Sequence, residues 1–111
     1  MNYVNRPDYN RSEELKARKD GAKLVKNSGR GMNKGDAIYR DIYMVDYKFT
    51  EKASYSLNLA KFKELEKQAT RQGMDPITVA VFECYNDKSI AMIDWDLLKE
   101  ILDERSFIGE Q

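Results

Sequence analysis

The chain has 111 residues and a mass of 12.9 kDa, with 19 basic side chains, 19 acidic ones, one cysteine and no histidine. One thiol excludes an internal disulfide, and the lack of histidine excludes both zinc sites of the Cys/His type and a histidine general base. Catalysis in this chain would therefore depend on carboxylates, on lysine or on a hard metal ion. The length fits a single domain over residues 1–111 with a buried core.

Basic and acidic side chains are unevenly distributed along the chain. Residues 11–40 hold nine lysines or arginines against four acids, whereas residues 83–111 hold eight acids against three bases. A basic segment of this kind favours an anionic polymer as partner. On charge alone, the simpler interpretation is that both segments are solvated surfaces.

No run of apolar residues approaches the ~20 that a membrane-spanning helix needs. The first residues, MNYVNRPDYNRSEE, include no apolar signal core. We therefore expect a cytoplasmic protein that has no membrane partner.

The N-terminal half is predicted to hold one helix and three strands. Residues 1–10 are expected to form a flexible arm with a turn at Arg6-Pro7-Asp8. A helix is predicted from Ser12, a favourable N-cap residue, to Asp20, with Gly21 ending it. The predicted strands are Ala22–Asn27, Asp36–Tyr39 and Ile42–Phe49, with a glycine-rich basic loop over 28–35 and a tight turn at Arg40-Asp41.

The third of these strands is apolar at its start on both faces. Because side chains alternate along a strand, one set faces one way and the next set the other. The two sets are Ile42, Met44, Asp46 and Lys48, and Tyr43, Val45, Tyr47 and Phe49. This pattern predicts a central strand that is covered on two sides.

The C-terminal half is predicted to contain helix, strand, strand and helix. The first helix spans residues 56–72, ends at Gly73 and has an apolar stripe of Leu59, Phe62, Leu65 and Ala69. Strands are predicted over Pro76–Glu83 and Ser89–Ile93, a turn at Asn86-Asp87-Lys88, and a last helix over Trp95–Glu104. Cys84 is expected to be a buried, inert thiol, and Tyr85 and Trp95 to be core or dimer contacts. The order of elements predicts an α/β fold with a central mixed β-sheet flanked by helices.

Two aspartates and a lysine converge on one region of the predicted sheet. Asp46 and Lys48 are two residues apart in a strand and so share a face, and Asp36 begins the neighbouring strand. Mg²⁺ binds oxygen ligands and retains several waters, so Asp36 and Asp46 would suffice to hold it against a phosphate. The ion would polarise the phosphate and lower the pKa of a bound water, while Lys48 would orient that water or stabilise the developing charge.

The same residues also have a purely structural interpretation. Asp-x-Lys is common in strands, and charged side chains often protect sheet edges. Here, however, the charges interrupt an apolar strand that is predicted to lie centrally, where an unpaired charge is costly. An ion pair between Asp46 and Lys48 would satisfy both of them but would leave Asp36 unexplained.

The ordered series of motifs resembles the PD-(D/E)XK nuclease superfamily, and within it the archaeal-type Holliday junction resolvases and their phage relatives. The series is a helical glutamate, a Ser/Gly-rich loop, Gly-Asp, Asp-x-Lys-x-Thr, and a helix before an apolar strand that begins with proline. The matching segments, from Ser12 to Phe82, include NSGRGMNKGDA, MVDYKFT and SYSLNLAKFKELEKQATRQGMDPITVAVF. The resemblance implies a restriction-endonuclease-like core.

The resemblance also implies roles for individual residues. Asp36 and Asp46 would be metal ligands together with the Tyr47 carbonyl, and Lys48 would be the catalytic lysine. The helical acid of the family falls on Glu13 or Glu14, with a slight preference for Glu13. The chain departs from the family pattern in two places: Gly35 replaces the proline of the superfamily's name, and Asp46 replaces the glutamate usual in this branch.

Several polar residues are candidates for DNA contacts. Ser28, Arg30 and Lys34 lie in a loop that would bind phosphates through amides and cations, or would be a simple turn. Residues after the Asp46 strand would extend that contact, or would form a solvated loop: Thr50, Lys52, Tyr55 and Ser56. Gln68 would lie behind the site, although an ordinary surface position is the simpler interpretation.

The resemblance implies a Mg²⁺-dependent endodeoxyribonuclease, with Mn²⁺ as a substitute, that resolves four-way DNA junctions as a homodimer in DNA recombination and repair. A phage-encoded enzyme would act in the host cytoplasm. Two alternatives remain open. One is a nuclease of the same fold that acts on other branched or linear DNA, and the other is a non-catalytic DNA-binding or assembly subunit.

Overall fold

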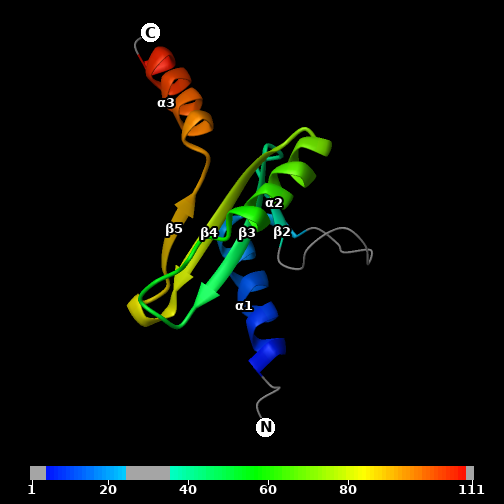
Figure 1. Ribbon diagram of the computed structural model, residues 1–111, viewed down its shortest axis with the longest axis vertical. Coiled ribbons are helices and arrows are strands. Elements are labelled where there is room, and N and C mark those ends of the chain that lie inside the picture. The colour runs from blue at the N-terminus through cyan, green and yellow to red at the C-terminus, as the bar shows by residue number, and fades with distance from the viewer. Residues whose placement is uncertain (1–4, 25–35, 110–111) are drawn as a thin grey trace.

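The protein is described by a computed structural model, which defines the backbone of residues 5–24 and 36–109 and the side chains of residues 12–24 and 37–104. Five strands form one sheet in the order of the chain: β1 (Lys23–Leu24), β2 (Asp36–Tyr39), β3 (Tyr43–Thr50), β4 (Asp75–Phe82) and β5 (Lys88–Met92). The helices are α1 (Asn5–Asp20), α2 (Leu59–Arg71) and α3 (Trp95–Gly109), with a 3-10 turn at Glu83–Tyr85 (Figure 1).

The sheet is mixed, as predicted. β3 and β4 are parallel and are connected through α2, whereas the other three neighbouring pairs are antiparallel. The α/β class and the predicted order of helices and strands are confirmed, and the arrangement is consistent with a restriction-endonuclease-like core. None of the helices in the described part is long and apolar enough to cross a membrane.

The central position of β3 is confirmed, and its two faces contact different helices. Val45 and Tyr47 pack in one buried cluster with Ala17 of α1, and Met44 packs in another with Phe62 and three other side chains. The helices α1 and α2 therefore cover opposite faces of the sheet (Figure 1). The alternation read from the sequence decides which side chains of β3 meet which helix.

The turns fall close to where the sequence places them. Arg40 and Asp41 both have a φ of 58°, the left-handed conformation that a tight hairpin of the type I′ pattern needs at its two central residues. Gly21 and Gly73 have φ of 84° and 69° and follow the ends of α1 and α2, as predicted. Asn86 and Asp87 are also left-handed and connect the 3-10 turn to β5.

The predicted arm over residues 1–10 is wrong for the described residues 5–10, because α1 begins at Asn5. Pro7 is the third residue of this helix. The first turn of a helix has N–H groups without intrahelical partners, so the missing N–H of a proline breaks no hydrogen bond there. The turn predicted at Arg6-Pro7-Asp8 is therefore the beginning of the helix.

The predicted stripe of α2 is confirmed except at its first member. Phe62, Leu65 and Ala69 are buried, but Leu59 is 60% exposed. Leu59 is the first helical residue, and Asn58 precedes it as an N-cap whose side chain accepts a hydrogen bond from the Lys61 N–H at 3.2 Å. The predicted start at Ser56 was early, since residues 56 and 57 precede this cap.

The burial predicted for Cys84 is wrong, and of the two alternatives for Tyr85 and Trp95, core or dimer contacts, the core position is wrong. Strand β4 ends at Phe82 and the chain enters the 3-10 turn, so Cys84 is exposed and Tyr85 is 62% exposed. Trp95 begins α3, which extends away from the sheet (Figure 1), and it is 61% exposed. None of the three is a core residue.

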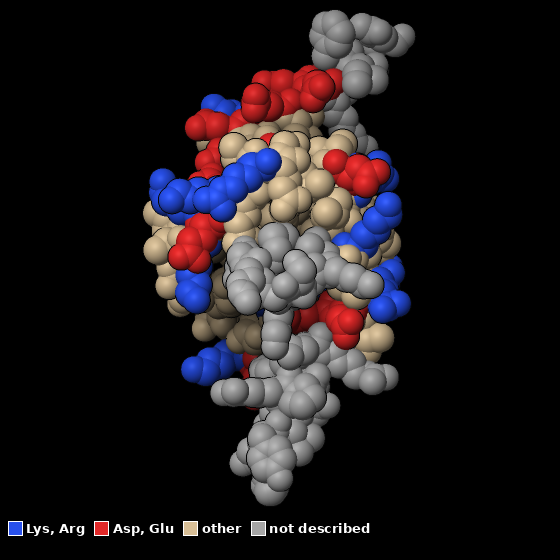
Figure 2. All heavy atoms as spheres, turned by 90° about the vertical axis from the view of Figure 1, so that its right-hand side faces the viewer, with Lys and Arg blue, Asp and Glu red and all other residues tan. Residues whose placement is uncertain are grey.

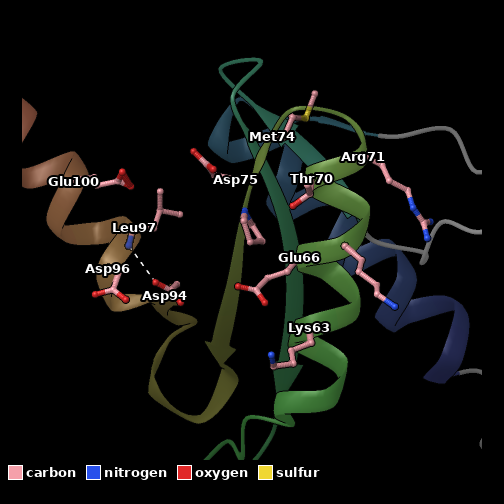
Figure 3. A pocket seen from close by; sticks show the side chains of 12 residues that line it. Lys63, Glu66, Thr70, Arg71, Met74, Asp75, Asp94, Asp96, Leu97 and Glu100 are labelled. Atoms are coloured by element: carbon pink, nitrogen blue, oxygen red, sulfur yellow. Dashed lines mark hydrogen bonds between the residues drawn. The ribbon is translucent and has the colours of Figure 1, made fainter.

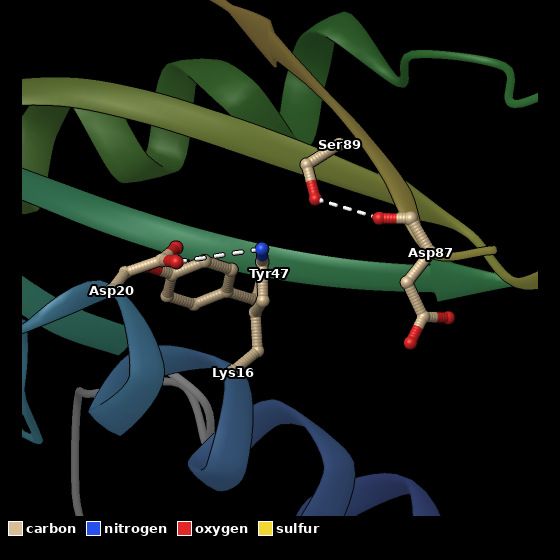
Figure 4. A network of polar contacts seen from close by, with 5 residues as sticks. All are labelled: Lys16, Asp20, Tyr47, Asp87 and Ser89. Carbon is tan, nitrogen blue, oxygen red and sulfur yellow. Dashed lines mark hydrogen bonds and ion pairs between the residues drawn. The ribbon is translucent and has the colours of Figure 1, made fainter.

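A polar network fastens α1 to the sheet. The Tyr47 hydroxyl donates a hydrogen bond to Asp20 Oδ2 at 2.9 Å, and Lys16 Nζ lies 3.4 Å from Asp20 Oδ1 (Figure 4). Burial, followed by the hydrogen bond to Asp20, raises the pKa of the Tyr47 phenol. The phenol therefore remains protonated at neutral pH and always donates to Asp20. In the same view, Ser89 Oγ donates to the Asp87 carbonyl at 3.1 Å (Figure 4).

We expect Tyr47→Phe to lower the free energy of unfolding by about 1 kcal/mol, because the hydrogen bond to Asp20 Oδ2 is lost while the ring packing remains. Urea denaturation at pH 7 measures this loss. Tyr43→Phe is the matched control, since Tyr43 is a half-buried tyrosine of the same strand that packs against the same cluster. Equal losses in the two variants would show that the Asp20 contact adds nothing.

Candidate active site

Asp46 lies in the middle of β3 and is only 8% exposed. Its position is paired across the sheet with Asp36 on β2 and with Thr78 on β4. Positions opposite one another in neighbouring strands belong to the same face of a sheet. The register therefore forms a row of three polar residues, Asp36, Asp46 and Thr78, across the centre of the molecule.

Lys48 lies beside Asp46, as the spacing predicted. Its Nζ atom is 3.5 Å from Asp46 Oδ2. The lysine side chain is 39% exposed and the aspartate side chain is 11% exposed, so the pair leads from the sheet interior towards solvent. An attacking water or a phosphate would therefore reach the lysine before the carboxylate.

The second oxygen of the Asp46 carboxylate, Oδ1, is buried and has no hydrogen-bond partner. Burial is the largest influence on this group and raises its pKa, while Lys48 and then Lys61 act in the opposite direction. A buried carboxylate oxygen without a partner is costly for a fold. A bound cation would satisfy this oxygen, and carboxylate oxygen is the ligand that Mg²⁺ prefers.

A small cavity of about 40 Å³ adjoins the carboxylate. It has room for a few water molecules or for a partly hydrated ion. The residues around it come from β3, from β4, and from the segment that leads into α2: Asp46, Lys48, Tyr55, Leu57, Asn58, Lys61, Phe62 and Thr78. Burial raises the pKa of the Tyr55 phenol, so this side chain is a neutral hydroxyl at the wall of the cavity at neutral pH.

The described side chains include no group of three acids, histidines or cysteines close enough together to hold a metal ion. The side chain of Asp36 is not among those described, and its position is given by the backbone register alone. Of the two aspartates predicted to bind a metal ion, Asp46 is thus the one whose side chain the structure describes. The Tyr47 carbonyl lies between Asp46 and Lys48 in the backbone of β3, while the Tyr47 ring faces α1.

The helical acid is placed on the other side of the sheet. Glu13 and Glu14 lie on α1, which covers the face that carries Val45 and Tyr47, whereas Asp46 and Lys48 face α2. The structure therefore separates this helix from the Asp46 cavity by the thickness of the sheet. A catalytic role for Glu13 stays a prediction from the resemblance.

The candidate DNA-binding residues fall into two groups. Ser28, Arg30 and Lys34 lie outside the described residues. Lys52 and Ser56 are exposed in the segment between β3 and α2, where Thr50 Oγ1 accepts a hydrogen bond from the Lys52 N–H at 3.1 Å. Gln68 is half-buried on α2, next to the Ala69 that contacts Met44.

Three polar residues around the cavity were not singled out in the sequence: Thr78, Asn58 and Lys61. Thr78 is a single polar residue within the apolar run PITVAVF, and that interruption was a signal that could have been used. Asn58 and Lys61 carried no such signal, because their approach to Asp46 depends on how α2 crosses the sheet.

Comparisons of the chain with models of protein families, with curated proteins and with solved structures gave no match.

Proposed function

We propose that this protein is a Mg²⁺-dependent endodeoxyribonuclease that resolves four-way DNA junctions. The observation that carries the proposal is the buried Asp46 Oδ1, which lacks a partner and adjoins a small cavity beside Lys48. A charge in this position harms the fold unless something binds it. The resemblance to the PD-(D/E)XK superfamily supplies the nuclease activity and the choice of junction DNA.

Each residue of the cavity has a distinct part in this proposal. Asp46, whose Oδ1 lacks a partner, would hold the ion together with Asp36, which is paired with it across the sheet. Held there, Mg²⁺ would supply positive charge to polarise the scissile phosphate. Lys48 lies nearer to solvent, where its ammonium group orients the attacking water and stabilises the charge that develops on the phosphate. Thr78 and Tyr55 bound the site and offer hydroxyl groups to ordered water.

A polyanionic partner is supported by the distribution of basic side chains. Besides Lys48, the described residues Lys52, Lys61 and Lys63 are exposed within or after the loop that follows β3. On the face seen in Figure 2, lysine and arginine side chains lie on both sides of a largely uncharged region, with aspartate and glutamate side chains among them. The lysines near the Asp46 cavity are the cations that would meet a DNA backbone, whose phosphates contribute most of the binding.

A homodimer is the expected assembly, because two sites related by a two-fold axis would cut two strands symmetrically. Exposed apolar side chains support it: Leu57, Leu59, Ile90, Trp95 and Leu102. An open groove of about 800 Å³ separates α2 from α3, with Lys63, Glu66 and Thr70 on one side and Asp94, Leu97 and Glu100 on the other (Figure 3). A helix that stands away from its own domain in this way leaves apolar surface for a second copy.

The pH dependence of cleavage follows from the environment of Asp46. Burial raises the pKa of its carboxyl group, and only the ionised form binds a metal ion. We therefore expect the acid limb of the pH profile of kcat/KM to lie at a higher pH than the ordinary pKa of an aspartate. A higher Mg²⁺ concentration should move that limb to lower pH, since the ion competes with the proton. Rate profiles at two Mg²⁺ concentrations measure this shift, and a limb that does not move would argue against Asp46 as the ligand.

Cleavage assays with matched substrates test the proposed function. The protein should cut a synthetic four-way junction in preference to a linear duplex of the same sequence. Equal cutting of both would indicate a nuclease of the same fold with another substrate.

A further inference from the structure

The first turn of α2 has an unusual charge for a helix N-terminus. Acidic side chains are favoured there, because the helix dipole places partial positive charge at this end. This turn contains no acid, and Lys61 is its third residue, with Lys63 two positions later. Positive side chains therefore add to the positive end of the helix instead of compensating it. Such an arrangement attracts an anion.

The backbone of the same turn has donors to offer. The Asn58 side chain accepts the Lys61 N–H, and the Asn58 carbonyl accepts the Phe62 N–H at 3.0 Å. Within the described part of the chain, the N–H groups of Leu59 and Ala60, the first two residues of the helix, have no hydrogen-bond acceptor. These are two of the donors that helices commonly leave for water or a ligand.

Lys61 also belongs to the cavity of Asp46. It borders that cavity together with Asn58 and Lys48. Among the described residues, no carboxylate lies within ion-pair distance of Lys61 Nζ. The cavity thus holds one buried carboxylate with an unpartnered oxygen and two lysines, so it has ligands for a cation and for an anion side by side. A metal ion would be held by the carboxylate, and an anion such as phosphate would be met by the lysines.

We propose that the first turn of α2, with Lys61 as its charged side chain, binds a backbone phosphate of the DNA strand that enters the Asp46 cavity. The inference rests on the proposed function for the identity of the anion. Lys48 serves the chemistry at the scissile phosphate, whereas Lys61 and the free N–H groups hold the strand. Lys61 is in this sense a binding residue.

The test compares Lys61→Gln with Lys67→Gln in the full chain. Lys67 is an exposed lysine of the same helix, farther from its N-terminus and away from the Asp46 cavity, so its loss controls for a general change in charge. Binding of a four-way junction is measured without Mg²⁺ over a range of salt concentrations, so that no strand is cut. Because this assay measures binding alone, an absence of nuclease activity can be distinguished from an absence of the phosphate site.

Lys61→Gln should weaken junction binding roughly tenfold and reduce the slope of log affinity against log salt concentration by about one. Lys61→Arg should retain wild-type affinity, and Lys67→Gln should change neither quantity. Unchanged affinity and salt slope in Lys61→Gln, or an equal loss in Lys67→Gln, would overturn the proposal.

Discussion

Asp46→Asn should reduce junction cleavage by at least roughly a thousandfold, since the proposed metal ligand is lost and metal-ion catalysis contributes several kcal/mol to such reactions. Junction affinity should remain close to that of the wild type, because the lysines that meet phosphates are unchanged. Single-turnover cleavage and an electrophoretic binding assay separate the two quantities.

The same substitution should leave the fold at least as stable at neutral pH. Burial raises the pKa of Asp46 by more than Lys48 and Lys61 lower it, so the ionised carboxylate destabilises the folded state. For a group whose pKa is raised on folding, stability is greatest below the unfolded pKa and decreases as pH rises through the folded pKa. Because an asparagine does not ionise, the stability of the variant should not show this decrease. Thermal unfolding from acid to neutral pH, compared with that of the wild type, measures the difference.

Asp75→Asn is the matched control for Asp46→Asn. Asp75 is also a strand aspartate, but it begins β4 opposite Tyr43 and lies away from the cavity. Its variant should cut the junction at the wild-type rate. If Asp46→Asn cut at that rate as well, the assignment of the metal site would be wrong.

Lys48→Gln is expected to lower kcat by roughly a hundredfold to a thousandfold, with a smaller effect on KM. Its ammonium group would stabilise charge that is present only in the transition state, so its removal affects the chemical step more than binding. Steady-state kinetics on the junction provides both constants. Lys67→Gln serves again as the control, and a change confined to KM would indicate that Lys48 only binds DNA.

The stability of Lys48→Gln should change in the opposite direction to that of Asp46→Asn. Lys48 Nζ is 3.5 Å from Asp46 Oδ2 and lowers the pKa of that carboxyl group. Without the lysine, the buried Asp46 carboxylate should lower the free energy of unfolding further at neutral pH. In an Asp46→Asn background this loss should disappear, because no charge is left for the lysine to compensate. Equal losses in the two backgrounds would show that the lysine stabilises the fold through some other contact.

The sequence was sufficient to predict the parts of the fold that depend on local periodicity. Alternation along β3 identified the side chains that meet α1 and those that meet α2, and it placed Asp46 and Lys48 on one face. Leu59 shows where periodicity fails. It continues the apolar stripe of α2, but it lies at the first position of the helix and remains exposed.

The environment of Asp46 could not be predicted in the same way. The cavity depends on the parallel register that brings Thr78 opposite Asp46 and on the crossing of α2 that brings Lys61 nearby. Both are contacts between residues distant in sequence, and no local pattern encodes them. Cys84 illustrates the same limit, because its burial was inferred from an apolar strand that ends two residues earlier.

The most direct test of the central claim is cleavage of a labelled mobile four-way junction by the wild-type protein, with and without Mg²⁺. A metal-dependent resolvase should produce paired nicks at symmetric positions in the two opposing strands when Mg²⁺ is present, and none when it is absent. Tight, salt-sensitive binding with no nick in either Mg²⁺ or Mn²⁺ would contradict the claim and would indicate a non-catalytic DNA-binding subunit.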